Sequence, residues 1–331
     1  MANIQLPYQT PIYSSLHYLA CPGVAAKQNP TCDIWYDNCT VALNGYYKHD
    51  SYPNNKPCFD LYLKEGSINH ISILDRTSIN TLFVKHCSIN LIRNILQEGY
   101  YVYFNNVDDF YVEGKQGYQS YHFPHDGMIS GIDDENKTLT LIAYDINGKF
   151  RPFITSQQSF EKGLLEGLKA KNETDDLWAM RANHTQYTLN VPAIIHAIQE
   201  YLNPLISTIS QDIFKCIWYG IETYEGLISC FEKVRRKEVV LRHPIMMLFW
   251  EHKKCMLHRL VQIETTRNMD HQYSAEYQTI VSGLERLRYL YLKYKMTLQD
   301  HILETLQTKL RLLKSQEIEI LSSFVQAPEV K

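Results

Sequence analysis

The chain has 331 residues, a formal net charge of −3 and a pI near 6.5. This length has room for one large domain or two of ordinary size, and the charge balance argues against a protein that binds nucleic-acid phosphates. The N-terminus lacks the basic and apolar regions of a secretory signal, and no apolar run approaches the length of a membrane span. We therefore expect a cytoplasmic protein that binds neither nucleic acid nor membrane, with its eight cysteines reduced.

The first half of the chain is rich in Gly, Pro, Asn and short β-prone runs. Residues 38–47 are predicted to form a helix that opens at Asn38, and residues 88–98 a second helix that ends at Gly99. The aromatic and β-branched content of residues 100–104 and 110–112 predicts two strands. Helices followed by antiparallel strands indicate an α+β domain.

Residues 121–145 are predicted to form a β-hairpin whose turn lies near Glu135. In a symmetric hairpin this centre places His125 directly opposite Asp145, with both side chains on one face. A histidine oriented by a carboxylate is the base half of a nucleophilic triad, which then needs a Ser or Cys from elsewhere. His122 and Asp126 are adjacent alternatives, although strand alternation places Asp126 on the other face from His125. The dipeptide at 147–148 predicts a tight turn into a third strand over 149–154.

A polar stretch at residues 169–176 has the composition of a linker, so we place a domain boundary at 170 and a helical domain over 171–331. Within it, apolar residues recur at helical spacing over 191–202, over 209–231, from Pro244 to Leu260 and over 280–298. The last pattern suits either a coiled-coil homodimer or an intramolecular bundle, and its tyrosines favour the bundle. The basic run 233–237 is interpreted first as a solvated helix end.

The nucleophile is predicted to be Cys39, because a thiol in the first turn of a helix is stabilised as thiolate by the helix dipole. Cys32, in a loop, is the nearest alternative, and Cys21 is a weaker one. The cysteines form no Cys-x-x-Cys pair, which argues against a zinc knuckle or a thioredoxin-like site. We expect no metal and no other cofactor.

Four stretches together resemble the papain-like family typified by the N-terminal domain of the butirosin biosynthesis acyltransferase, which is related to the C39 peptidases. They are residues 35–39, 107–112, 122–126 and 131–134, and the resemblance covers roughly residues 15–165. It implies a papain-like domain over 1–170 with a helix-borne cysteine and an antiparallel sheet that carries the base and the acid. Matched residue by residue, Cys39 corresponds to the nucleophile, His125 to the base and Asp145 to the orienting acid.

This chain departs from the papain-like pattern at the oxyanion hole. The glutamine that usually precedes the nucleophile in papain-like enzymes has no counterpart here. The Asn38 amide is a candidate donor, and the backbone N–H of Cys39 is the other.

The family occurs in bacterial clusters for thioester-templated natural products, including antibiotics of the nonribosomal-peptide type. The resemblance, which extends in type to the closthioamide amide synthetase, implies transfer of an acyl group from a carrier-protein phosphopantetheine thioester through cysteine to a small amine. The helical domain could then exclude water and dock an acidic acyl or peptidyl carrier protein through Lys233, Arg235, Arg236 and Lys237. The alternatives are a peptidase or amidase of the same fold, and a non-catalytic scaffold protein.

Overall fold

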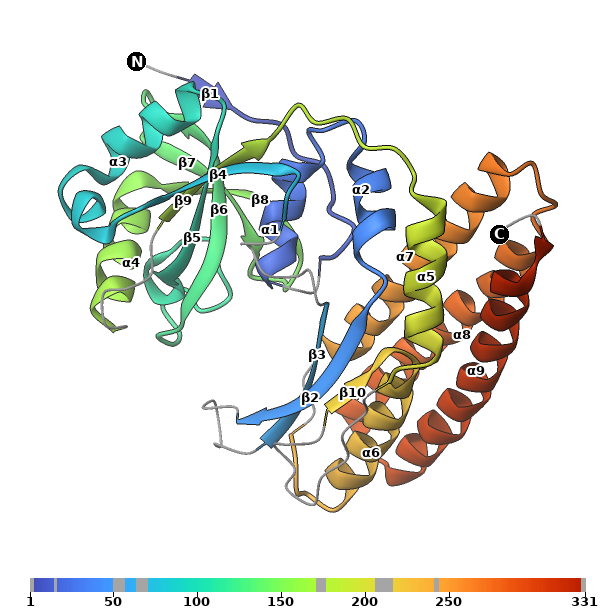
Figure 1. Ribbon diagram of the computed structural model, residues 1–331. Coiled ribbons are helices and arrows are strands. Elements are labelled where there is room, and N and C mark those ends of the chain that lie inside the picture. Colours follow the sequence, from blue (N-terminus) through green and yellow to red (C-terminus); the bar gives the residue numbers. More distant parts are fainter. Residues whose placement is uncertain are drawn as a thin grey trace. The chain divides into compact units, whose positions relative to one another are not determined.

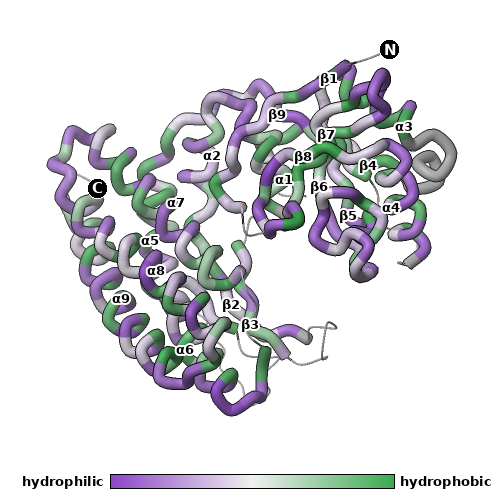
Figure 2. The backbone as a smooth tube through the Cα atoms, turned by 180° about the vertical axis from the view of Figure 1, so that it is seen from behind, coloured by the Kyte–Doolittle hydropathy of each residue, from purple (hydrophilic) through white to green (hydrophobic). Residues whose placement is uncertain are grey.

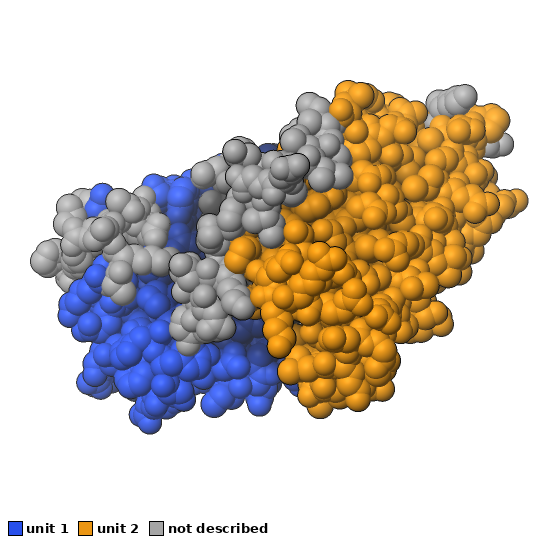
Figure 3. All heavy atoms as spheres, turned by 90° about the horizontal axis from the view of Figure 1, so that it is seen from below, with its two compact units in different colours: residues 1–32, 68–186 blue, residues 33–67, 187–331 orange. Residues whose placement is uncertain are grey.

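A computed structural model describes residues 3–14, 17–49, 57–63, 71–170, 177–205, 217–240 and 244–328. The chain divides into two compact units, shown in different colours in Figure 3. Unit 1 comprises residues 1–32 and 68–186, and unit 2 comprises residues 33–67 and 187–331. This division differs from the expected boundary at 170, because the segment that carries Cys39 belongs with the C-terminal helices.

Unit 1 contains a seven-stranded antiparallel sheet in the order β4-β9-β5-β6-β7-β8, with β1 also paired to β6 (Figure 1). Side chains of β5, β6 and β7 pack with Phe160 and Leu164 of helix α4 in one core. The strands are β1 (Asn3–Gln5), β4 (Leu74–Ile79), β5 (Tyr101–Asp108), β6 (Pro124–Asp133), β7 (Thr138–Tyr144), β8 (Phe150–Ser156) and β9 (Leu177–Ala182). The helices are α1 (His17–Ala26), α3 (Thr81–Gln97) and α4 (Gln157–Ala170).

The predicted hairpin is confirmed as β6 and β7. Met128 lies opposite Ile142 and Ile129 opposite Leu141, which is the register that a centre at Glu135 requires. A β-bulge after Ile129 shifts the rest of the ladder by one residue. The helix expected over 88–98 lies within α3, and the strands expected over 100–104 and 149–154 lie largely within β5 and β8.

The strand predicted over 110–112 is wrong. The chain forms a 3-10 turn, η2 (Asp109–Tyr111), because the side chain of Asp108 accepts a hydrogen bond from the N–H of Phe110 and caps the turn.

The helix predicted over 38–47 is also wrong. Helix α2 (Cys32–Cys39) ends at Cys39, and strand β2 (Leu43–His49) follows. The Asn38 side chain does not cap a helix start; it bonds to residues 188 and 190, which lie about 150 positions later in the chain. Cys39 therefore lies at the negative end of a helix dipole, which does not favour a thiolate.

Unit 2 combines a three-stranded antiparallel sheet, in the order β10-β2-β3, with a helical C-terminal region. Long helices pack on one another within this unit, α8 against both α7 and α9 (Figure 1). Along α8 and α9, hydrophobic and hydrophilic residues alternate as amphipathic helices require (Figure 2). The remaining elements are β3 (Pro57–Leu63), β10 (Ile217–Tyr219), η4 (Gly220–Glu222), α5 (Val191–Leu202), α6 (Thr223–Arg235), α7 (Ile245–Thr266), α8 (Gln272–Thr297) and α9 (Asp300–Gln326).

The predicted apolar patterns over 191–202, from 244 and over 280–298 correspond to α5, α7 and α8. The pattern over 209–231 falls partly on residues 206–216, which lie outside the described residues, and continues through β10 into α6. Helix α9 was not predicted as a separate element. Within the described ranges, no helix has both the length and the apolar character needed to cross a membrane.

Candidate functional site

His125 lies near the start of β6, opposite Val107 of β5, with 16% of its side chain exposed. Asp109 places Oδ2 3.9 Å from its Nδ1, and Asp126 places Oδ1 3.6 Å from its Nε2. Two carboxylates at these distances stabilise the positive charge that the ring acquires when it takes a proton. His125 thus has a carboxylate near each of its ring nitrogens.

The expectation that Asp126 faces away from His125 is wrong. Asp126 Oδ1 lies 3.6 Å from Nε2 of His125, so the two side chains meet. The β5–β6 ladder is irregular at this point, with a bulge in β5 between Phe104 and Val107. The Asp126 carboxylate also accepts a hydrogen bond of 3.3 Å from the hydroxyl of Tyr103.

Asp145, the predicted orienting acid, holds a turn in the structure. Its buried carboxylate accepts hydrogen bonds from the backbone N–H groups of Asn147 and Lys149 and from Nε of Arg151, at 2.8, 2.9 and 2.5 Å. Burial alone would raise the pKa of Asp145, but the bonds from Lys149, Arg151 and Asn147 outweigh it and the pKa is lowered. The carboxylates that the structure places beside His125 are instead those of Asp109 and Asp126.

Lys115 is a fully buried cation that contacts both Asp109 and Asp126. Its Nζ lies 3.1 Å from Asp109 Oδ1 and donates a 3.1 Å hydrogen bond to the carbonyl of Asp126. The backbone of Lys115 pairs with that of Asp145 in an isolated antiparallel β-bridge. Burial raises the pKa of the Asp109 carboxyl, and Lys115 partly opposes this rise. The sequence offered one signal for this cluster, the pair Asp108-Asp109 directly after an aromatic strand.

His122, weighed above as an alternative base, forms the shorter histidine–carboxylate pair. Its Nδ1 lies 2.7 Å from Oδ2 of Asp108, whose Oδ1 accepts the backbone N–H groups of Phe110 and Phe123. The ring stacks on Phe110 with centroids 4.3 Å apart, and 62% of the side chain is exposed. Unit 1 thus carries two imidazoles beside carboxylates near the start of β6.

Cys39 is the most accessible cysteine of those whose environment is described. Five others, Cys21, Cys32, Cys58, Cys230 and Cys255, are buried. Cys32 is the first residue of α2 rather than part of a loop, yet burial removes it as a nucleophile. Burial likewise raises the pKa of the Cys21 thiol well above its usual value.

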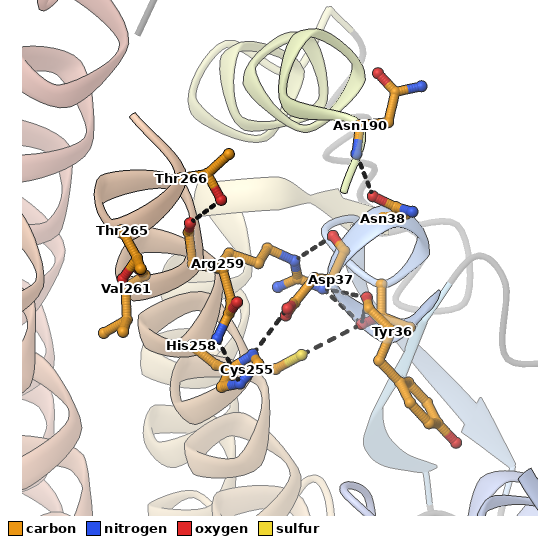
Figure 4. A network of polar contacts seen from close by, with 12 residues as sticks. Tyr36, Asp37, Asn38, Asn190, Cys255, His258, Arg259, Val261, Thr265 and Thr266 are labelled. Carbon is orange, nitrogen blue, oxygen red and sulfur yellow. Dashed lines mark hydrogen bonds and ion pairs between the residues drawn. The ribbon is translucent and has the colours of Figure 1, made fainter. Parts of the chain in front are cut away.

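The end of α2 that carries Cys39 is held within unit 2 by helix α7 (Figure 4). Nε and one terminal nitrogen of Arg259 donate to the carbonyls of Asp37 and Tyr36, and the same terminal nitrogen donates to the hydroxyl of Thr40. Asp37 Oδ2 lies 2.8 Å from Nδ1 of His258. Buried Arg259 therefore binds the last carbonyls of α2, including that of Tyr36, which also accepts the N–H of Thr40.

The Asn38 amide, a predicted oxyanion donor, is engaged by its own unit. Its Nδ2 donates to the carbonyl of Thr188 at 2.9 Å, and its Oδ1 accepts from the N–H of Asn190 at 2.9 Å (Figure 4). An amide held at both ends is poorly placed to serve a developing oxyanion. The backbone N–H of Cys39, the other predicted donor, lies in the last turn of α2, where helical N–H groups bond to the carbonyls one turn earlier.

The Asp37–His258 pair should make the stability of unit 2 depend on pH. The hydrogen bond that His258 donates to the Asp37 carboxylate raises the pKa of His258, although partial burial opposes this rise. The stabilisation is then fully present below the ordinary histidine pKa of about 6.5 and is lost as pH rises through the raised folded-state value. His258→Gln should flatten the dependence of unfolding free energy on pH over this window, measured by urea denaturation.

His196→Gln provides the matched control, because His196 is 73% exposed on α5. An unchanged slope in His258→Gln would contradict the assigned coupling, as would an imidazole of His258 that titrates at or below the ordinary value in NMR spectra.

The basic run at 233–237 lies at the end of α6, as its interpretation as a helix end predicts. Arg235 pairs with Glu232 at 2.8 Å and with Glu304 at 3.0 Å, and Arg236 pairs with Glu232 at 3.0 Å. Lys233 lies 4.0 Å from Glu238. Acidic neighbours thus offset most of the charge that was expected to attract a carrier protein, which weakens that expectation for Lys233, Arg235, Arg236 and Lys237.

Neither a scan of the sequence against protein-family models nor a search of curated proteins found a match for this chain.

Proposed function

We propose that the protein is a papain-like cysteine acyltransferase that forms an amide from an acyl thioester, with Cys39 as nucleophile and His125 as base. The observation that carries the proposal is the partial exposure of Cys39 where the other described cysteines are buried. Reactive cysteines are accessible, whereas buried ones are inert. The carboxylate-flanked His125 on an antiparallel sheet supports the second half of the proposal.

The reaction has two halves. The Cys39 thiolate attacks the thioester carbonyl, the bond from carbon to the carrier's sulfur breaks, and the imidazolium of His125 gives its proton to the leaving thiolate. An amine then attacks the acyl-enzyme, gives a proton to His125, and releases the Cys39 thiolate as the amide forms. Asp109 and Asp126 stabilise the imidazolium that is present before the first half and forms again in the second. The donor is an acyl or peptidyl carrier protein, and the acceptor is a small amine.

The proposed nucleophile and base come from different units. Cys39 belongs to unit 2 and His125 to unit 1.

Incubation with an acyl N-acetylcysteamine thioester should add the mass of one acyl group to the intact protein. The adduct should be absent from Cys39→Ala and present in Cys230→Ala, which removes a buried thiol of the same unit. The adduct is measured by intact-mass spectrometry. Benzylamine added afterwards should remove the acyl group from the protein and release it as the N-benzyl amide.

An adduct that forms equally on Cys39→Ala would sink the assignment of the nucleophile. Loss of the adduct to water, with no amide formed, would instead indicate a peptidase or amidase of the same chemistry.

A further inference from the structure

A surface groove runs between α8 and α9 in unit 2. It has a volume of about 400 Å³, and its lining includes Gly283 and Leu290 of α8 and Leu312 and Leu313 of α9. A Cβ on residue 283 would lie only 2.7 Å from a methyl carbon of Leu313, so the absence of a side chain on Gly283 leaves room for Leu313 at the floor of the groove. Leu312 is 56% exposed to water at the groove. An exposed leucine beside an apolar floor offers apolar surface that a partner can cover.

The rim of the groove is positively charged on both walls. Arg286 lies on α8 and Lys309 on α9, both are exposed, and no acidic side chain lines the groove. Neither cation takes part in an ion pair within the described part of the chain. This distinguishes the groove from the basic run on α6, whose arginines are paired with Glu232 and Glu304.

We propose that the α8–α9 groove binds an acidic amphipathic helix of a partner protein. The partner's apolar face would cover Leu290, Leu312 and Leu313, and its flanking carboxylates would meet Arg286 and Lys309. Grooves between two helices bind a third helix in this way, through apolar residues that recur every three or four positions. Charges on both walls then set the sign and orientation of the partner.

Two other occupants fit less well. A second copy of the chain in a two-fold dimer through this groove would bring Arg286 and Lys309 of each copy close to those of the other, and such like charges repel. A free acyl chain needs an enclosed pocket that covers most of its surface, whereas this groove leaves Leu312 largely in water. The inference does not depend on acyl transfer, and if that proposal holds, the acidic helix belongs to the carrier protein.

The test is fluorescence anisotropy of a labelled helical peptide of about 18 residues, or five turns, with leucines on one face and glutamates beside them. It should bind, and a peptide with lysine in place of every glutamate should not. The double variant Arg286→Glu/Lys309→Glu and the single variant Leu312→Gln should each weaken binding by about tenfold or more.

Two matched controls lie on the same helices outside the groove. Arg311→Glu reverses an exposed charge on α9, and Met296→Gln replaces an exposed apolar residue on α8. Both should bind the acidic peptide as the wild type does, and urea denaturation should show that all variants fold.

Several results would overturn the proposal. They are no binding of the acidic peptide at up to about 1 mM, equal binding of the basic peptide, no effect of the charge reversal, and a protein dimer that Leu312→Gln dissociates. Saturable binding of laurate without binding of the peptide would also overturn it. Because Cys39→Ala should bind the peptide normally, this outcome and that of the acylation experiment are read separately.

Discussion

Glu317→Ala should be the most damaging single substitution in unit 2, with a loss of about 3–5 kcal/mol in unfolding free energy. Glu317 is fully buried on α9, and its carboxylate accepts hydrogen bonds from four side chains on four other helices. They are Lys253 at 2.9 Å, Tyr277 at 2.6 Å, Tyr224 at 2.7 Å and Tyr201 at 3.3 Å. Urea denaturation followed by circular dichroism measures the loss.

The physical reason is the charge that the substitution leaves behind. Lys253 is fully buried, and burial lowers its pKa, while Glu317 opposes that shift. Without Glu317, the ammonium group keeps the hydroxyl of Tyr201 and the faces of nearby aromatic rings but has no counter-charge. Three buried tyrosine hydroxyls also lose their acceptor. One carboxylate thus ties α5, α6, α7, α8 and α9 together.

The double variant Lys253→Met/Glu317→Leu serves as the control. Because it removes both charges, it should cost less than the sum of the two single substitutions. Additive losses in the double variant, or a loss below about 1 kcal/mol in Glu317→Ala, would show that the cluster does not hold the helices as described.

Regular patterns in the sequence predicted the regular parts of the fold. The β6–β7 hairpin could be located because two alternating strands flank a polar turn. The turn's centre gave the register of the pairs at Met128 and Ile129, but not of those nearer the turn, which the bulge shifts by one. Helices α5, α7 and α8 could be located because their buried residues recur at helical spacing. These signals are local, and tertiary contacts agree with them.

The errors arose where a polar side chain had two possible roles. Asn38 has the residue type of a helix cap, yet its partners at 188 and 190 come from about 150 residues later, so no local pattern could show that α2 ends there. An aspartate at position 145 can either face a residue on the neighbouring strand or accept the N–H groups of the turn that follows it. In the structure, Asp145 accepts the N–H groups of the turn. Asp109 and Lys115, which the prediction missed, come together only when η2 and β6 are in place.

In the proposed function, the position of Cys39 at the C-terminal end of α2 makes its thiolate depend more strongly on His125. Because the dipole of α2 does not stabilise a thiolate at Cys39, an imidazole must supply that stabilisation. His125→Gln should therefore slow the reaction of Cys39 with an alkylating reagent at neutral pH by about tenfold or more, since only the thiolate reacts. His258→Gln is the matched control, because His258 already bonds to Asp37 in the same unit as Cys39.

The most direct measurement is the rate of iodoacetamide alkylation of Cys39 as a function of pH, followed on the peptide that carries it. We expect Cys39 of the wild type and of His258→Gln to react rapidly at neutral pH, and Cys39 of His125→Gln to react rapidly only at alkaline pH. Identical profiles for the wild type and His125→Gln would contradict the pairing of Cys39 with His125, and a loss confined to His258→Gln would move the base to α7.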